Sequence, residues 1–361
     1  MKEMELQILL IQTNNKLKAI QIILSCFFCI YLHILQILLL VIEMRIGIPK
    51  AMATYEYPIL FESFFKELGI DVVYSNDTNK KIMNDGIKYS VDEACLASKI
   101  CLGHVKNLID RGKREKIDAI FIPRICSFRK NETVCVKFYA MYDICKTVFD
   151  YKFVTLNLDE KRGKNELIAF LNLGHSLGVG YSKAYNAYKI AKKKQTEYYK
   201  LSILENYQRL QDLSYSPNIL IVSHPYVIND KYIGVPLVNY LEGLGANIFY
   251  SNINESLINK KKSSSYKNYS STLYWKFSKN VLNGISDYIE KIDGIIYISS
   301  FPCGPDSLVT ELTMRSIKDI PSINILLDEQ DGNAGIYTRL ESFFDILDER
   351  KKLQKGILVN E

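Results

Sequence analysis

The chain lacks the short glycine-rich sequences that most directly identify an enzyme class. It contains no Gly-x-Gly-x-x-Gly, no Walker loop and no Gly-x-Ser-x-Gly, which argues against the standard nucleotide-binding folds and against an esterase. From residue 44 onward it also has no Cys-x-x-Cys pair and no ferredoxin-type run of cysteines. A closed structural zinc site built on paired cysteines is therefore not expected.

A concentrated basic face is also missing. The formal net charge of +6 is spread over a lysine-rich sequence, so we attribute it to surface solubility and expect no nucleic-acid partner. The 361 residues are 48% hydrophobic and 24% charged, which is typical of a globular chain long enough for two domains. The eight cysteines do not form the dense framework of a small secreted domain, and this favours a reducing, cytoplasmic compartment with metal or redox use.

The N-terminal 43 residues differ from the rest of the chain. Residues 20–42 are almost continuously apolar and by length satisfy the requirement for a membrane span, yet no small-residue cleavage site of the secretory type follows them. A new start is visible at Met44, which opens the strand pattern of residues 45–48. Two interpretations of residues 1–43 remain: translated sequence upstream of a real initiator at Met44, or a membrane anchor through residues 20–42.

From residue 44 onward, short apolar runs alternate with segments of helical periodicity, which indicates parallel sheets with right-handed crossovers. The expected strands are residues 45–48, 71–75, 119–123, 153–156, 218–223, 247–250, 295–299 and 322–327. The expected helices are residues 57–68, 93–111, 137–149, 234–244, 273–291, 307–317 and 338–349, with a nearly continuous helical pattern over 165–213 and a polar loop over 260–271. We predict an α/β fold of two Rossmann-like domains with parallel sheets, 44–160 and 215–361, joined by a helical bridge at 161–214.

Three cysteines occupy expected loop-to-helix junctions. Cys303 follows an apolar run and precedes a helical pattern, and Cys95 and Cys135 are placed in the same way. Backbone amides and the helix dipole at such positions favour a thiolate. Three thiolates meeting from two domains would suit an iron-sulfur site with the fourth iron open. The alternative is that these cysteines only pack.

The remaining cysteines and the histidines are weaker candidates. Cys126 follows an expected strand end and is a reserve ligand, whereas Cys101 and Cys145 are assigned to helix cores. His104 and His175 are interpreted as structural histidines with satisfied hydrogen bonds. His224 is the better candidate because it lies at a strand's carboxyl end, with Asp230 in the same loop.

Several separated motifs occur in an order that resembles the family related to 2-hydroxyacyl-CoA dehydratase subunits and their activases. The resemblance covers most of residues 44–348. Its motifs are Met44–Lys50, Asp92–Cys95, Phe121–Arg124, Cys135–Phe138, His224–Tyr226, Cys303–Asp306, Asp328–Glu329, Ala334–Gly335 and Thr338–Glu341. Val136 replaces the family's usual proline, and Ala97-Ser98 replaces a proline-containing pair. Both changes affect helix entry more than metal ligation.

The resemblance implies that Cys95, Cys135 and Cys303 hold a [4Fe-4S] cluster in a cleft between the two lobes, with Glu329 and Arg339 as candidates for its polar lining. It also implies ATP-coupled, low-potential one-electron reduction or dehydration of an acyl-CoA-like thioester in anaerobic metabolism. A separate activase would hydrolyse ATP, since no ATP motif is apparent here, and a second dehydratase-like subunit is a further expected partner. Three hypotheses follow: a lyase-like dehydratase or reductase component, a non-catalytic electron-transfer or scaffold subunit, and a cluster-free two-domain binding protein.

Overall fold

The computed structural model describes residues 44–210, 216–254, 257, 273–330 and 334–354. The apolar stretch at 20–42 and the polar loop expected at 260–271 lie outside these residues. The described residues from Arg45 onward form one compact unit. None of the helices in the described ranges combines the length and the apolar character that crossing a membrane requires.

The first sheet is parallel and has the strand order β2-β1-β3-β6. Its strands are β1 (Arg45–Ile48), β2 (Asp71–Tyr74), β3 (Ala119–Phe121) and β6 (Phe153–Val154). The helices of this part are α2 (Ala53–Glu56), α3 (Leu60–Leu68), α4 (Lys80–Lys88), α5 (Leu96–Glu115) and α6 (Val136–Val148). Helix α3 packs its phenylalanines on the sheet and ends at Gly69, whose φ of 81° requires the left-handed conformation that glycine adopts readily.

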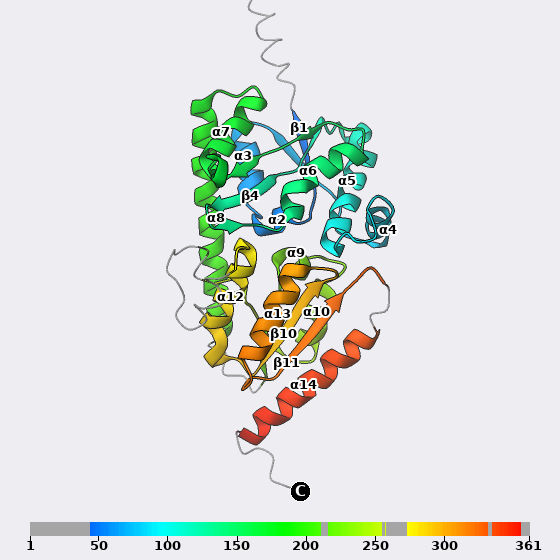
Figure 1. The fold of residues 1–361 in the computed structure, drawn as a ribbon, viewed down its shortest axis with the longest axis vertical. Helices are drawn as coiled ribbons and strands as arrows, with labels where there is room; N and C mark the ends of the chain where they lie inside the picture. Colours follow the sequence, from blue (N-terminus) through cyan, green and yellow to red (C-terminus); the bar gives the residue numbers. More distant parts are fainter. Residues whose placement is uncertain (1–43, 211–215, 255–256, 258–272, 331–333, 355–361) are drawn as a thin grey trace, which may run out of the picture. The chain divides into compact units, whose positions relative to one another are not determined.

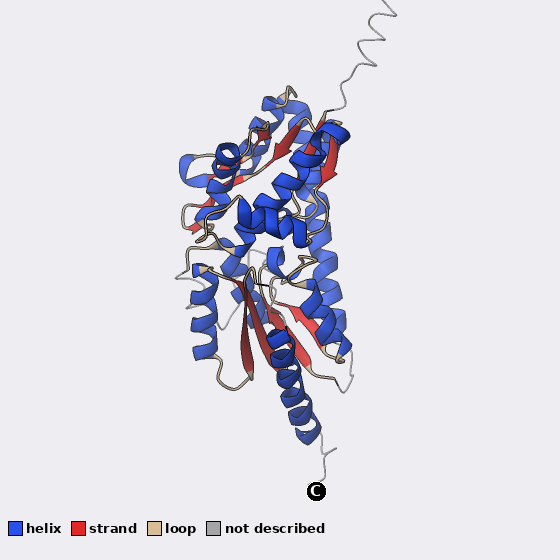
Figure 2. Cartoon of the chain, turned by 90° about the vertical axis from the view of Figure 1, so that its right-hand side faces the viewer, coloured by secondary structure: helices blue, strands red, loops and turns tan. Residues whose placement is uncertain are grey.

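The second sheet is also parallel, with the order β11-β10-β8-β9. Its strands are β8 (Asn218–Val222), β9 (Asn247–Tyr250), β10 (Gly294–Ser300) and β11 (Ser322–Leu327). The helices are α9 (Pro225–Ile228), α10 (Val235–Gly243), α12 (Lys276–Tyr288), α13 (Gly304–Ser316) and α14 (Ala334–Gln354), with a 3-10 turn η3 at Ile289–Lys291. Every residue of β10 is buried, as expected for an apolar strand covered by helices on both faces. Figures 1 and 2 show this sheet flanked by helices.

A third, smaller sheet was not expected from the sequence. It has the order β5-β4-β7 and pairs β4 antiparallel with β5 but parallel with β7. Its strands are β4 (Arg124–Arg129), β5 (Glu132–Thr133) and β7 (Asn157–Asp159), and β7 leads into the 3-10 turn η1 (Glu160–Arg162). The sequence predicts that Cys126 follows a strand end, but the structure places it within β4. Strands of two or three residues are too short to produce a recognisable alternating pattern.

Two helices connect the sheets, α7 (Glu166–Ser176) and α8 (Tyr181–Leu210). The sequence predicted an almost unbroken helix here, but the chain turns between them, where Gly178 has a φ of 78°. Helix α8 runs beside both parts of the molecule (Figure 1). The side-chain oxygen of Gln195 accepts hydrogen bonds from the amides of Ile59 and Leu60. The Asn206 side-chain amide donates to the carbonyl of Tyr250, the last residue of β9, and to that of Ile253 after it.

The fold class predicted from the sequence, an α/β fold with two parallel sheets flanked by helices, is confirmed. The domain boundaries at residues 160 and 214 stay predictions.

Candidate functional site

The three candidate cysteines each stand directly before a helix. Cys95 precedes α5, Cys135 precedes α6 and Cys303 precedes α13, and each occupies the N-cap position. A polar N-cap side chain normally accepts a hydrogen bond from the first turn, but none of these three does so. The thiol of Cys95 instead contacts the Ser98 hydroxyl at 3.1 Å.

The structure brings these three cysteines to one cavity of about 450 Å³, which we call the cysteine cavity. The other residues lining it come from both parts of the fold: Met52, Ala97, Val134, Lys137, Phe138, His224, Tyr226, Trp275, Phe277, Ser278, Ser300 and Pro305. His224 and Cys303 meet there because they follow β8 and β10, which pair directly in the second sheet and end at the same edge.

Backbone hydrogen bonds hold the cysteine loops together. The amide of Leu96 donates to the carbonyl of Phe301 at 2.9 Å, and the amide of Thr133 donates to the carbonyl of Tyr274 at 2.8 Å. Each bond joins a segment beside a cysteine of the first part to a segment of the second. The cavity is therefore formed where the two parts of the chain meet.

Burial changes the expected chemistry of the thiols. Desolvation raises the pKa of Cys135, and desolvation together with the charge of Asp306 raises the pKa of Cys303. The backbone amides of Lys137 and Asp306 act in the opposite direction but do not outweigh burial. The helix amides thus favour the thiolate as expected, but burial opposes it more strongly at Cys135 and Cys303. A bound cation is what would favour their charged form.

His224 forms a polar wall of the cysteine cavity. Its Nε2 lies 2.7 Å from Oδ1 of Asp306, and its Nδ1 lies 3.8 Å from Oε1 of Glu56. Burial opposes protonation of the ring, but Asp306 and Glu56 together raise the pKa of His224. Glu56 was not singled out from the sequence, and Asp306 was noted only within the Cys303–Asp306 motif. Nothing in their local patterns places either residue beside His224.

Met52 was also missed by the sequence argument. It lines the cysteine cavity and has a φ of 47°, a conformation that is uncommon for any residue other than glycine and asparagine. A methionine in an apolar segment gives no local signal of such a backbone.

The other sequence candidates lie elsewhere. Glu329 forms an ion pair with Lys99, whose side chain is only 3% exposed, and Arg339 donates to the carbonyl of Asn324 at 2.8 Å. Neither lines the cysteine cavity, and neither does Cys126. Cys101 and Cys145 are buried within helices, as predicted.

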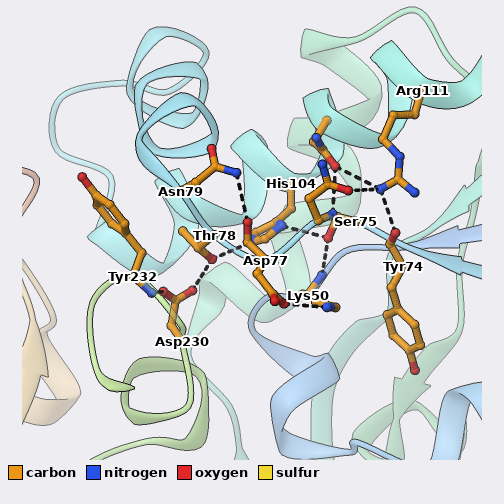
Figure 3. Close-up of polar contacts among 12 residues, drawn as sticks. Lys50, Tyr74, Ser75, Asp77, Thr78, Asn79, His104, Arg111, Asp230 and Tyr232 are labelled. Carbon is orange, nitrogen blue, oxygen red and sulfur yellow. Dashed lines mark hydrogen bonds and ion pairs between the residues drawn. The ribbon is translucent and has the colours of Figure 1, made fainter. Parts of the chain in front are cut away.

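His104 belongs to a separate polar chain that joins the two parts of the fold (Figure 3). Ser75 contacts its Nδ1 at 2.8 Å, and Thr78 contacts its Nε2 at 2.9 Å. Thr78 in turn donates to Oδ2 of Asp230 at 2.5 Å. His104 is thus a satisfied structural histidine, as predicted, whereas Asp230 pairs with Thr78 and not with His224. His175 stacks on Tyr181 at 5.1 Å.

In the described part of the chain, no three histidine, cysteine, aspartate or glutamate side chains form a group that could hold a metal ion. The three cysteines thus line one cavity without forming a group that could hold a single metal ion.

The solved structures that match the chain are only distantly similar to it. Solved structures that resemble the chain include the SBP FpvC of Pseudomonas aeruginosa in complex with Ni²⁺, at 10% identity over 88% of this chain and 99% of that one, with a TM-score of 0.25. Another is the laminin binding protein Lmb of Streptococcus agalactiae, at 11% identity over 86% and 99%, with a TM-score of 0.24. TM-scores this low support no conclusion about ligand or function. The search of curated proteins found no match to the chain.

The family comparison agrees with the motifs. The model described as the CoA enzyme activase uncharacterised domain (DUF2229) matches residues 45–253, a span that includes Cys95, Cys135 and His224 but ends before Cys303. The resemblance expected from the motifs is thereby confirmed, and the chain belongs to this CoA enzyme activase-related family.

Proposed function

We propose that the cysteine cavity holds a [4Fe-4S] cluster on Cys95, Cys135 and Cys303. We further propose that the protein takes part in ATP-coupled, low-potential one-electron reduction or dehydration of an acyl-CoA-like thioester, with a separate activase that hydrolyses ATP. The observation that carries this proposal is the placement of three helix-capping cysteines from α5, α6 and α13 around one cavity.

The donor set fits such a group. Soft thiolate ligands suit iron-sulfur clusters, and three of them leave one iron of a cubane without a cysteine. Thiolates that bind different irons of one cluster lie about 6 to 7 Å apart, wider than ligands around a single ion. The raised pKa values of Cys135 and Cys303 mean that these thiols release their protons when a cation binds.

When bound, the cluster would supply one electron at low potential and an open iron position. The chain's own residues would control access to it. Phe138, Trp275 and Phe277 provide apolar walls that limit the entry of water. His224 and Asp306 hold a proton in their 2.7 Å hydrogen bond at the wall of the cavity, within a region from which bulk solvent is largely excluded.

Anaerobic purification followed by iron and sulfide analysis tests the cluster. We expect about four irons and four sulfides per chain, with the broad visible absorption of a cluster. Substituting Cys95, Cys135 or Cys303 by serine should remove most of the iron. Cys126→Ser is the matched control, since Cys126 is also partly accessible but lies outside the cavity. Wild-type protein without iron, or full iron in Cys303→Ser, would refute the proposal.

An enzyme assay tests the proposed dehydration separately from the presence of the cluster. Iron-loaded protein is mixed with a reduced activase, ATP and a 2-hydroxyacyl-CoA, and the unsaturated product is measured. Product formation supports a dehydratase component. A loaded cluster that accepts electrons without product formation indicates an electron-transfer or scaffold subunit.

A further inference from the structure

A second cavity, of about 510 Å³, borders the cysteine cavity and shares His224 and Phe277 with it. Its other walls come from the end of α2, from α8, α9 and α12, and from the chain after β9. The residues used below are Tyr55, Glu56, Tyr198, Tyr199, Asn252 and Asn280, all of which line it.

Four buried polar atoms at this second cavity have no hydrogen-bond partner among the described residues. They are Oε1 of Glu56, Nδ1 of His224, Oδ1 of Asn252 and Oδ1 of Asn280. The side chains of Glu56 and His224 are only 8% and 6% exposed. Buried polar atoms are almost always hydrogen-bonded in native proteins. Four unpartnered atoms around one cavity therefore indicate a ligand that supplies the missing contacts.

The charge of the cavity selects the ligand. Glu56 is the one carboxylate among the described residues that line it, and that lining contains no lysine or arginine. Burial raises the pKa of Glu56 to about 7, with His224 and Lys276 lowering it and Asp306 raising it. His224 also faces Glu56 and is a cation when protonated, but the same ring is paired with Asp306, 2.7 Å from its Nε2, while its Nδ1 lies 3.8 Å from Glu56. One positive ring between two carboxylates leaves a negative charge unmatched, which a cation entering the cavity would compensate.

The shape of the lining favours an organic cation. Four aromatic residues, Tyr55, Tyr198, Tyr199 and Phe277, line the cavity, and aromatic rings attract cations. An ammonium group has three hydrogen-bond donors and no acceptor, which matches the oxygens of Glu56, Asn252 and Asn280. A neutral hydroxyl could satisfy one oxygen but would leave the charge of Glu56 unmatched.

We infer that the second cavity binds the ammonium group of a small primary amine, with Glu56 as its counter-ion. This site goes beyond the proposed cluster function and does not depend on it, since none of its contacts uses a cysteine.

Isothermal titration calorimetry of the full chain at pH 8 with butylammonium chloride tests this inference. Butan-1-ol has the same carbon chain without the charge, and potassium chloride supplies a cation without the chain. We expect butylammonium to bind with 1:1 stoichiometry and at least about tenfold more tightly than either control. Equal affinity for butan-1-ol would overturn the ammonium assignment, and tighter binding of potassium would replace it with a metal-ion site.

Two variants locate the binding. Glu56→Gln keeps the size of the side chain and should weaken butylammonium binding about tenfold or more. Glu197→Gln is the matched control, because Glu197 precedes Tyr198 on α8 but has a 56% exposed side chain outside the cavity. Unchanged affinity in Glu56→Gln would refute the inference.

Asn280→Leu serves as the second test, since it removes an acceptor while keeping Glu56. It should weaken butylammonium binding about threefold to tenfold. Thermal unfolding shows whether each variant is folded, and iron content should stay at the wild-type level in Glu56→Gln. If Glu56→Gln loses both iron and amine binding, the substitution disrupts both cavities, and Asn280→Leu then decides the question. Unchanged butylammonium binding in Asn280→Leu would refute a site in which the ammonium group contacts the oxygens of Glu56, Asn252 and Asn280.

Discussion

The backbone amide of Leu96 donates a 2.9 Å hydrogen bond to the carbonyl oxygen of Phe301. It joins the first residue of α5, beside Cys95, to the loop that carries Cys303. The first amides of a helix have no partner within the helix, so this bond satisfies a group that would otherwise need water. The relative position of the two cysteines is thus set by backbone contacts.

Thr78→Val tests the polar chain between the two parts of the fold. The change keeps the shape of the side chain but leaves His104 Nε2 and Asp230 Oδ2 without their Thr78 contacts. Because unpartnered buried groups are unfavourable, we expect the free energy of unfolding to fall by about 2 to 4 kcal/mol. Urea denaturation measures it. Thr147→Val removes an exposed hydroxyl that bonds only within α6, and an equal loss in that control would contradict the role of Thr78.

Acid should destabilise the protein through His104. Burial lowers the pKa of His104 to about 3, with Lys50 lowering it further and Asp77 raising it, from an ordinary value of 6.5. The unfolded chain therefore binds a proton between these two values that the folded chain does not. The contribution of neutral His104 is complete above about pH 6.5 and decreases toward pH 3 as the pH falls, by up to about 1.4 kcal/mol per pH unit.

His104→Gln should flatten that part of the pH dependence. Urea denaturation at pH 7, 6, 5 and 4 gives the slope for each protein. His175→Gln, which replaces an exposed histidine, should leave the slope as in the wild type. The assignment fails if both variants change the slope equally.

Gly103→Ala should force α4 and α5 apart. A Cβ at Gly103 would lie 1.9 Å from the carbonyl oxygen of Ile82, a backbone atom that cannot simply rotate away. We expect a loss of about 1 to 3 kcal/mol in unfolding free energy, typical of overpacking, measured by thermal or urea unfolding. Gly243→Ala, in a helix where the new Cβ meets no atom within 4 Å, should be neutral or slightly stabilising, and a comparable loss there would argue against the close approach as the cause.

Glu329→Gln should be more damaging than an ordinary surface substitution. It would leave the Lys99 ammonium, on a side chain only 3% exposed, without its counter-ion. Since Glu329 itself is 38% exposed, we expect a moderate loss of about 1 to 2 kcal/mol in urea denaturation. Glu311→Gln breaks a fully surface pair with Arg315 and should change stability by less than about 0.5 kcal/mol. Similar values for the two variants would show that Lys99 finds another partner.

Much of the fold could be predicted because its signals are local. Apolar runs such as residues 294–300 are long enough to indicate buried strands, and the residues after them were correctly placed before helices, as Cys303 shows. The small sheet escaped prediction because β5 and β7 have only two and three residues, and because β4 (Arg124–Arg129) carries polar residues and two arginines in place of an apolar run. The break between α7 and α8 depends on a turn at Gly178 within an otherwise helical pattern.

The candidate site was only partly predictable. The three cysteines shared a local context, so their common location could be expected from sheet topology. Glu56 and Asn252 come together with His224 only through tertiary packing, and no spacing in the sequence encodes that. The local pattern indicated the helix amides that favour a thiolate at Cys303. It did not indicate the burial and the Asp306 charge that raise the pKa of this thiol, because both depend on tertiary packing.

Helix α8 has 30 residues, and at 1.5 Å per residue it is a rod of about 45 Å. Near its first end Lys183 donates to the carbonyl of Leu68, the last residue of α3, and Gln195 in its middle binds the start of α3. Its other end is held beside β9 through Asn206. A long helix that is hydrogen-bonded near both ends resists hinge bending between the two sheets. Relative motion of the sheets would then be limited to a twist or a small sliding movement. Wide opening between the two sheets would therefore require these contacts of α8 to break.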